Sequence, residues 1–273
     1  MADPHPNQKV ALVTGASSGF GALTAAGLAA SGYRVFGTSR QPQLGGPRAV
    51  EMLALDVQSD ESVAACLKQL LGAAGRLDVL VNNAGLGHNS LVEETSLEQA
   101  RYIVETDFWG AVRVTNGALP IMRRQRGGRV IMVSSVAGLI GAVGMAYYSA
   151  SKFALTGYSE ALSYEVEPFG LQVSLIEPGY FKTKAGASLL TAAHTISEYD
   201  DIRRTVLARM EQSRAQGGNA QRVADTIVRV AESRSPRLHY RVGPDAVWFP
   251  RFKAWIPERV FRYFVRQNYH LPQ

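Results

Sequence analysis

Short apolar runs alternate with longer stretches of helical periodicity along the first two thirds of the chain. The apolar runs predict buried strands at Val10–Val13, Arg34–Thr38, Val50–Leu55, Val79–Val81, Val130–Val133 and Val173–Ile176. The periodic stretches predict helices at Leu23–Ser31, from an N-cap at Ser59 to about Ala74, from Ser96 to near Pro120, and at Ala146–Glu167. Strands that alternate with helices of this length predict an α/β fold, with a doubly wound parallel sheet between two helical layers.

The pattern weakens after Gly179, where small and apolar residues follow one another without a clear period. Two more helices are expected at Asp200–Arg214 and Val223–Ala231, and a short strand at Leu238–Val242. Neither an internal repeat nor a flexible linker interrupts the sequence. We therefore expect one domain spanning residues 1–273, with an irregular loop at about 180–220 and an aromatic and basic tail at about 246–273.

The amino-acid composition of the chain argues against several classes of function. The chain has 273 residues, of which 46% are hydrophobic and 19% charged, an ordinary globular mixture. The net charge of +6 is modest and no basic stripe is evident, so no nucleic-acid partner is expected. A single cysteine, Cys66, excludes an internal disulfide and a cysteine cage, and no metal site is expected. The polar N-terminus and the lack of a long apolar run argue for a cytoplasmic protein without a membrane span.

A glycine-rich segment follows the first predicted strand and opens the first predicted helix. Its sequence, TGASSGFG over residues 14–21, has glycines where the backbone must turn sharply and approach a ligand closely. Free N–H groups and the helix dipole favour a phosphate at such a helix N-terminus. A simple glycine-rich turn is the alternative. We expect the pyrophosphate of a dinucleotide to lie against Gly15, Ser17, Ser18, Gly19, Phe20 and Gly21.

Further motifs follow the later strands. They are Asp56-Val57, Asn82-Asn83-Ala84-Gly85, Ser134-Ser135, the segment YSASK from Tyr148 to Lys152, and Pro178-Gly179. In this order, and with the glycine spacing TGxxxGxG, residues from about Lys9 to Thr183 resemble the short-chain dehydrogenase/reductase family. The resemblance implies a Rossmann fold and hydride transfer between a nicotinamide cofactor and a carbonyl or secondary alcohol. It is closest to the steroid- and retinol-dehydrogenase-like or ketoacyl-reductase-like branches.

Tyr148, Lys152 and Ser135 are the expected catalytic residues. Tyr148 and Lys152 are four positions apart, so their side chains share one helix face. A free tyrosine titrates near 10, and lowering its pKa to about 7 takes on the order of 4 kcal/mol, which an ammonium and an oxidised nicotinamide can supply together. The resemblance assigns Ser135 to the substrate oxygen and gives Lys152 a second role at the nicotinamide ribose. A chance surface pair is the alternative for the Tyr–Lys spacing alone.

The resemblance also assigns the remaining cofactor contacts. Asp56 is expected to accept a hydrogen bond from the adenine amine, and Val57 to line the adenine slot. Asn83 is expected at the adenosine-side ribose, whereas Asn82 braces the turn after the strand; an Asx turn is the alternative for both. The other expected contacts are Ala84, Gly85, Pro178, Gly179, Phe181 and Thr183, of which the last four cover the nicotinamide and pyrophosphate.

The end of the second predicted strand indicates which nicotinamide cofactor is used. A carboxylate at this place would hold the ribose 2′-hydroxyl of NAD. The chain instead has Ser39 and Arg40, whose side chains can hold a 2′-phosphate. We therefore expect NADP(H), with a solvated arginine as the alternative.

One position departs from the family pattern. Asp107 stands three residues before Gly110, where the family has an asparagine that holds a water molecule linking the lysine to solvent. An aspartate there can pair with Lys152, but it raises the pKa of that ammonium and offsets its effect on Tyr148. The substitution leaves a second hypothesis open, in which the protein is a redox sensor that binds NADP(H) without turnover.

Apolar residues near the expected site favour a lipophilic ketone, steroid, retinoid or acyl chain as substrate, with a 3-oxoacyl thioester as the alternative. They are Leu139, Ile140, Val143, Met145, Leu189 and Leu190. The tail from Trp248 to Tyr269 mixes aromatic residues with arginines, and we expect it to pack over the substrate mouth or at a subunit interface in preference to a membrane surface. Family members often pair through the long helix, so a homodimer or homotetramer is expected.

Overall fold

A seven-stranded sheet forms the centre of the computed structural model, which describes residues 8–42, 46–182 and 189–269. Its strand order is β11-β7-β6-β4-β1-β2-β3, and every neighbouring pair is parallel. The strands are β1 (Val10–Val13), β2 (Arg34–Ser39), β3 (Val50–Ala54), β4 (Val79–Asn82), β6 (Gly128–Val133), β7 (Leu171–Pro178) and β11 (His239–Val242). Two small parallel pairs join β5 (Gly87–Asn89) to β9 (Leu189–Thr191) and β8 (Phe181–Lys182) to β10 (Gly218–Asn219).

The helices that connect the strands cover both faces of the sheet, and two further helices follow the last strand. They are α1 (Gly19–Ala30), α2 (Asp60–Ala74), α3 (Leu97–Val104), α4 (Gly110–Gln125), α5 (Ala146–Val166), α6 (Asp200–Ala215), α7 (Gln221–Glu232), α8 (Pro244–Trp255) and α9 (Glu258–Asn268). A π-helical turn, Glu105–Trp109, joins α3 to α4. Short 3-10 turns lie at Val136–Gly138, Glu167–Phe169 and Ser197–Tyr199.

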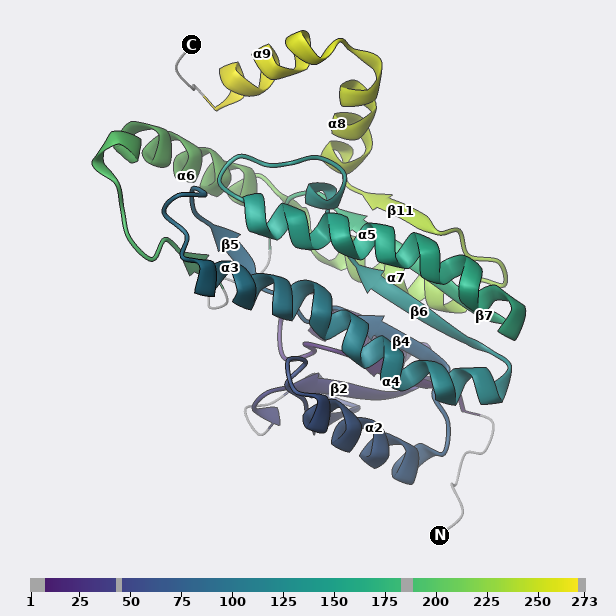
Figure 1. The fold of residues 1–273 in the computed structure, drawn as a ribbon. Coiled ribbons are helices and arrows are strands. Elements are labelled where there is room, and N and C mark those ends of the chain that lie inside the picture. Colours follow the sequence, from purple (N-terminus) through teal and green to yellow (C-terminus); the bar gives the residue numbers. More distant parts are fainter. Residues whose placement is uncertain (1–7, 43–45, 183–188, 270–273) are drawn as a thin grey trace.

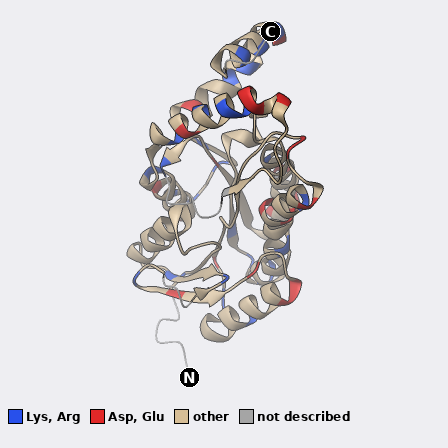
Figure 2. Ribbon diagram, turned by 90° about the vertical axis from the view of Figure 1, so that its left-hand side faces the viewer, with Lys and Arg blue, Asp and Glu red and all other residues tan. Residues whose placement is uncertain are grey.

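Alternation along the strands creates two cores. Successive side chains of a strand point to opposite faces, so Val10 and Leu12 pack with α2, α4 and α5, whereas Ala11 and Val13 pack with α1 and α7. Figure 1 shows α2, α4 and α5 side by side over one face, and Figure 2 shows helices on both sides of the sheet. The expected three-layer, doubly wound Rossmann fold is confirmed.

Helix α2 matches its expected ends. Ser59 caps it, accepting a hydrogen bond from the Ser62 N–H at 3.1 Å, and Gly75 ends it in the left-handed region with φ of 68°. Cys66 points into the core from this helix. Burial raises the pKa of its thiol to about 11, so the thiol stays protonated at neutral pH.

The predicted end of the helix near Pro120 is wrong. A capping box of Ser96 and Gln99 opens α3 as expected, but helical structure continues through the π turn and past Pro120 to the end of α4. Proline removes one backbone hydrogen bond from a helix. Here Ala118 and Met122, on either side of Pro120, are completely buried against the sheet. Tertiary burial of this face outweighs the local break.

The last two helices extend beyond the sheet. Figure 1 shows α8 leaving the end of β11 and α9 turning back above α6. In the part of the chain that the structure describes, every helix is too short or too polar to cross a bilayer.

The close packing of α1 on the end of β1 can be tested by comparing two helical glycines, one in α1 and a control in α2. A Cβ at Gly21 would collide with the carbonyl oxygen of Gly15 and lie 2.5 Å from Nδ2 of Asn83, whereas Gly72 in α2 has open space there. We expect Gly21→Ala to lower the free energy of unfolding by about 1–3 kcal/mol through overpacking. Gly72→Ala should raise it by about 0.5–1 kcal/mol through helix propensity. Urea denaturation measures both, and equal midpoints for the two variants would contradict this account.

Candidate active site

The carboxyl ends of the parallel strands open into a cleft of about 380 Å³. Its walls come from seven separate stretches of the sequence, and five of these lie at strand ends that the sheet brings to one edge. The expected site residues that line the cleft are Gly15, Ser17, Ser18, Gly19, Phe20, Ser39, Arg40, Asp56, Val57, Asn83, Ala84, Gly85, Asp107, Tyr148 and Lys152.

The glycine-rich loop is shaped to approach an anion. Gly15 and Gly19 have φ of +66° and +56°, a region that favours glycine. Ser18, the N-cap of α1, makes no side-chain capping bond within the described residues, and the first turn of α1 holds no acidic residue. The N-terminal N–H groups of α1 are therefore available to a phosphate. Gly21 lies outside the cleft lining and acts by allowing α1 to pack closely on Gly15.

Ser39 and Arg40 lie at the end of β2, on the rim of the cleft. The Ser39 Oγ is buried and has no hydrogen-bond partner among the described residues. The guanidinium of Arg40 is exposed, and its Nη1 donates a hydrogen bond to the hydroxyl of Tyr102 at 3.3 Å. A buried hydroxyl that lacks a partner is unfavourable unless a ligand completes it, so this corner fits an anionic group. Sequence reasoning missed Tyr102, because it reaches the rim from α3 and follows no strand.

The asparagines after β4 brace the strand ends. Nδ2 of Asn83 donates to the carbonyl oxygens of Thr14 at 2.9 Å and Gly15 at 3.2 Å, so this side chain supports the glycine loop. Nδ2 of Asn82 donates to Oγ1 of Thr115 at 2.8 Å, as a bracing residue should. The ribose contact assigned to Asn83 stays a prediction.

The residues after β3 line the far end of the cleft. Asp56 is exposed, and its Oδ1 accepts a hydrogen bond from the Gln58 N–H at 3.0 Å. Val57 is buried against Gly110, where an added Cβ would lie 2.6 Å from the valine side chain. Both side chains border the cleft, as the adenine assignment requires.

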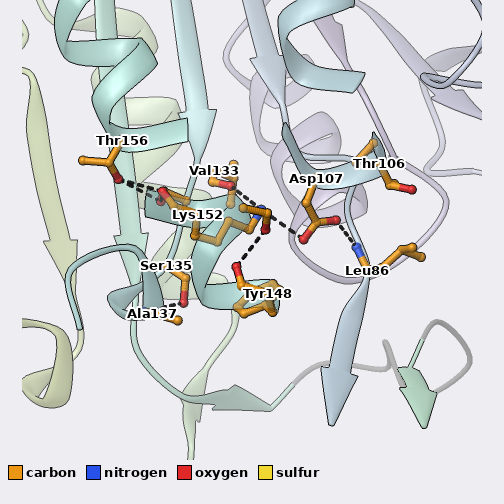
Figure 3. Close-up of polar contacts among 12 residues, drawn as sticks. Leu86, Thr106, Asp107, Val133, Ser135, Ala137, Tyr148, Lys152 and Thr156 are labelled. Carbon is orange, nitrogen blue, oxygen red and sulfur yellow. Dashed lines mark hydrogen bonds and ion pairs between the residues drawn. The ribbon is translucent and has the colours of Figure 1, made fainter. Parts of the chain in front are cut away.

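Tyr148 and Lys152 lie together in the first turns of α5. The Nζ of Lys152 is 5.5 Å from the centre of the Tyr148 ring and donates to the carbonyl oxygen of Val133 at 3.3 Å. Figure 3 shows the lysine side chain reaching toward Asp107 with Tyr148 beside it. The lysine is buried, so its charge is felt strongly by these neighbours.

Asp107 faces Lys152 from the π-helical turn. Its Oδ1 accepts a hydrogen bond from the Leu86 N–H at 2.7 Å, and its Oδ2 lies 3.6 Å from Nζ of Lys152. The second distance is long for a hydrogen bond, so the attraction is mainly coulombic. Gly85 is packed against this pair, because a Cβ there would lie 3.2 Å from Oδ1. The expected pairing with Lys152 is therefore present, and no helical pattern in the sequence signals the π turn that produces it.

The electrostatics of this cluster favour a neutral phenol and a charged amine. Burial raises the pKa of Tyr148 and Asp107 raises it further, while Lys152 and a hydrogen bond with Ser135 lower it without reversing the shift. Burial lowers the pKa of Lys152, but Asp107 and Tyr148 raise it more, so the net direction is upward. These directions agree with the expected effect of Asp107. Without an oxidised nicotinamide nearby, Tyr148 is protonated at neutral pH and suited to donate a proton.

The two serines after β6 have different environments. The Oγ of Ser135 accepts a hydrogen bond from the Ala137 N–H at 3.1 Å, and Ser135 is partly exposed. The Oγ of Ser134 is buried and lies 3.5 Å from both the carbonyl oxygen of Lys152 and Oγ1 of Thr156. Ser134, which borders the cleft, thus holds α5 to the sheet. Ser135 is absent from the described lining of the cleft, and its contact with the substrate oxygen stays a prediction.

The residues at and after the end of β7 are not part of the described cleft wall. Pro178, Gly179 and Phe181 are absent from its described lining, and Thr183 lies outside the described residues. The Phe181 ring packs edge-on against Phe20, a residue of the cleft wall, with ring centres 5.9 Å apart. The nicotinamide and pyrophosphate contacts assigned to Pro178, Gly179, Phe181 and Thr183 stay predictions.

Asp245, at the start of α8, was missed from the sequence. Its Oδ2 accepts a hydrogen bond from the Tyr180 N–H at 2.6 Å, and a Cβ added to Gly179 would collide with its carboxylate. The carboxylate therefore fixes the backbone that follows β7. Nothing in the sequence points to it, since it lies far along the chain in the final quarter.

Comparisons with known proteins agree with this geometry. Residues 9–193 match the family model described as short chain dehydrogenase. A 3-ketodihydrosphingosine reductase of Bacteroides thetaiotaomicron is 37% identical over 96% of this chain and 98% of the relative. A retinol dehydrogenase 8 of Bos taurus is 38% identical over 91% and 86%, and the 3-oxoacyl acyl-carrier-protein reductase FabG of Escherichia coli is 33% identical over 82% and 89%.

A solved structure shows the same likeness in three dimensions. The crystal structure of a short-chain dehydrogenase from Streptomyces avermitilis superposes with a TM-score of 0.83, at 32% identity, over 98% of this chain and 97% of that one. The family model thus agrees over residues 9–193, and the bacterial relative and the solved structure agree along nearly the whole sequence. The chain belongs to the short-chain dehydrogenase/reductase family, and it is an oxidoreductase of carbonyl and alcohol groups that binds a nicotinamide cofactor.

Proposed function

We propose that this oxidoreductase uses NADP(H) to interconvert a lipophilic ketone and its secondary alcohol. The observation that carries the proposal is the position of Tyr148, a half-buried phenol beside the charged Lys152, in the same cleft as the glycine loop and Arg40. A proton donor and a site shaped for a dinucleotide thus share one cavity.

The chain's own residues account for the proton half of the reaction. Bound NADPH would supply hydride to the carbonyl carbon. Tyr148 donates its phenolic proton to the carbonyl oxygen, and Ser135 hydrogen-bonds the same oxygen as negative charge develops there. Lys152 keeps a positive charge beside the phenolate that remains. In the oxidation direction the phenolate accepts the alcohol proton.

The choice of NADP(H) rests on the corner formed by Ser39, Arg40 and Tyr102. An exposed guanidinium and a buried hydroxyl without a partner suit a 2′-phosphate, and no carboxylate stands at the end of β2 to hold a free 2′-hydroxyl. The guanidinium would also attract the phosphate over a longer range.

The substrate class rests on apolar side chains near Tyr148. Leu139, Ile140, Val143 and Met145 are only half-buried, so they leave apolar surface on the segment that leads into α5 and Tyr148. Such surface favours a lipophilic substrate over a sugar. Relatives named for a ketosphingoid base and for retinol support the same class, while the relative named for 3-oxoacyl groups supports the thioester alternative.

We also propose that the protein is a single domain and a homo-oligomer. Large hydrophobic side chains are exposed on the π turn and α5, at Trp109, Phe153 and Tyr164, and a contact between subunits would cover them. The cytoplasmic location stays a prediction.

Replacing the phenol tests the catalytic assignment. We expect Tyr148→Phe to lower kcat for NADPH-dependent reduction of lipophilic ketones by roughly 10²–10⁴-fold, since general acid catalysis is lost. NADPH should still bind. The control is Tyr147→Phe, which removes the adjacent hydroxyl and should retain activity. Stopped-flow oxidation of NADPH measures both. If the wild type binds NADPH but oxidises it with no ketone or 3-oxoacyl thioester, the protein is a sensor and the proposal fails.

Reversing one charge tests the cofactor assignment. Arg40→Asp should weaken NADPH binding by at least about tenfold and improve NADH binding, because a carboxylate repels the 2′-phosphate and accepts from a 2′-hydroxyl. Arg48→Asp makes the same charge change on an exposed residue outside the cleft lining and should alter neither affinity. Fluorescence titration gives both dissociation constants. Unchanged NADPH affinity in Arg40→Asp would refute the choice of NADP(H).

Removing the charge of Asp107 tests its role as a positioning residue. Because Asp107 raises the pKa of both Tyr148 and Lys152, Asp107→Asn should lower both. Reduction requires the protonated phenol. In Asp107→Asn, the fall of kcat/KM for reduction at alkaline pH should therefore occur about one pH unit lower than in the wild type. Glu105→Gln is the control, since it removes a carboxylate of the same π turn that pairs with Arg113 instead. Superimposable pH profiles for Asp107→Asn and wild type would remove Asp107 from the proton chemistry.

A further inference from the structure

Exposed hydrophobic side chains gather on the last two helices. Trp248, Trp255 and Tyr263 are 64%, 86% and 62% exposed, and Val260 and Phe264 are also exposed. Single exposed hydrophobics are common on proteins, but a contiguous group marks a surface that contacts something else. The tail was expected to pack its aromatic residues over the substrate mouth or at a subunit interface. In this structure its two tryptophans instead lie in solvent.

The aromatic rings between α8 and α9 hold the two helices together. The Phe252 ring lies 5.3 Å from that of Phe264 and 6.3 Å from that of Phe261. Contacts at both ends tie this pair to the body. At one end Asp245 binds the Tyr180 N–H, and at the other Nη2 of Arg209 in α6 donates to the Asn268 side chain at 2.8 Å. The exposed hydrophobics thus belong to a folded unit.

Three stripes run along α9. Positions three or four apart share a helix face. Phe261, Val265 and Asn268 are half-buried and form the stripe that faces the body. Val260, Tyr263 and Phe264 form an exposed apolar stripe, and Arg259, Arg262 and Arg266 form an exposed basic stripe beside it. A helix with an apolar stripe flanked by arginines has the form of helices that lie in a membrane interface.

The charge of this surface indicates which kind of partner it binds. From Trp248 to Tyr269 the chain has five basic residues and one acidic residue. Figure 2 shows Lys and Arg colouring the helices that project from the body at this end. The Arg251 guanidinium lies 5.6 Å from the centre of the Trp248 ring, so cation and aromatic ring are presented together. A symmetric contact between two such tails would oppose like charges, whereas an anionic surface would neutralise them.

We propose that α8 and α9 dock on the surface of an anionic lipid bilayer, with Trp248, Trp255 and Tyr263 inserted at the headgroup level and the arginines on the lipid phosphates. The docked unit is tied through Asp245 to the backbone that follows β7, beside the cleft. A lipophilic substrate dissolved in that bilayer would thereby reach the site without crossing water. The docking itself needs neither cofactor nor turnover, so it stands or falls separately from the proposed reaction.

Co-sedimentation of the full chain with vesicles tests the docking. We expect binding to vesicles rich in phosphatidylglycerol, at least about tenfold weaker binding to pure phosphatidylcholine vesicles, and weakening by salt. Two of the three tryptophans of the chain lie in α8, so a blue shift of the fluorescence should accompany binding. Equal affinity for both vesicle types, or no binding to either, would overturn the proposal.

Matched variants separate the tail from the rest of the surface. The triple change Arg259→Gln, Arg262→Gln and Arg266→Gln should lower vesicle affinity by at least about tenfold. The control triple Lys68→Gln, Arg101→Gln and Arg124→Gln makes the same charge change at exposed positions elsewhere and should bind as the wild type does.

A second pair of variants tests the exposed aromatics. Trp255→Ala should weaken vesicle binding several-fold, whereas Tyr164→Ala, which removes a comparably exposed ring from α5, should not. Gel filtration of each variant, checked by circular dichroism for folding, shows whether the oligomeric state changes. If the tail variants dissociate an oligomer while vesicle binding is unaltered, the surface is a contact between copies of the chain and the proposal is wrong.

Discussion

All seven strands of the central sheet run in one direction, and their carboxyl ends therefore meet at one edge. Each strand must return through a crossover, so the helices lie on the two faces and leave this edge open. Residues that follow different strands, such as Gly15, Asp56 and Asn83, come to border one cleft. The short loops there fix each side chain relative to a well-packed core on both faces.

A buried ammonium dominates the electrostatics of the cleft. Removing the charge of Lys152 from water costs several kcal/mol unless nearby groups compensate. Val133 supplies a carbonyl oxygen and Asp107 a carboxylate, and both lie within 3.6 Å of Nζ. The carboxylate that keeps Lys152 charged also raises the pKa of Tyr148. Asp107 therefore favours the protonated phenol, which is the form that the proposed reduction consumes.

Patterns that depend on near neighbours in the chain were enough to predict most of the fold. Alternating short strands and helices indicated the parallel sheet, and the cap at Ser59 marked the start of α2. The spacing of Tyr148 and Lys152 on one helix face, and the glycines at Gly15 and Gly19, likewise follow from local geometry. These features are readable because backbone conformation and helical period are properties of the local sequence.

Tertiary structure decided what depends on distant contacts. The helix continues through Pro120 because its flanking residues are buried against the sheet, and the π turn aims Asp107 at Lys152. Asn83 braces the glycine loop, and Asp245 fixes the backbone after β7 from the far end of the chain. The sequence by itself determined the order of the elements and indicated which residues are expected to carry the chemistry. Burial, and the electrostatic environment that burial creates, were decided only when segments remote in the sequence packed together.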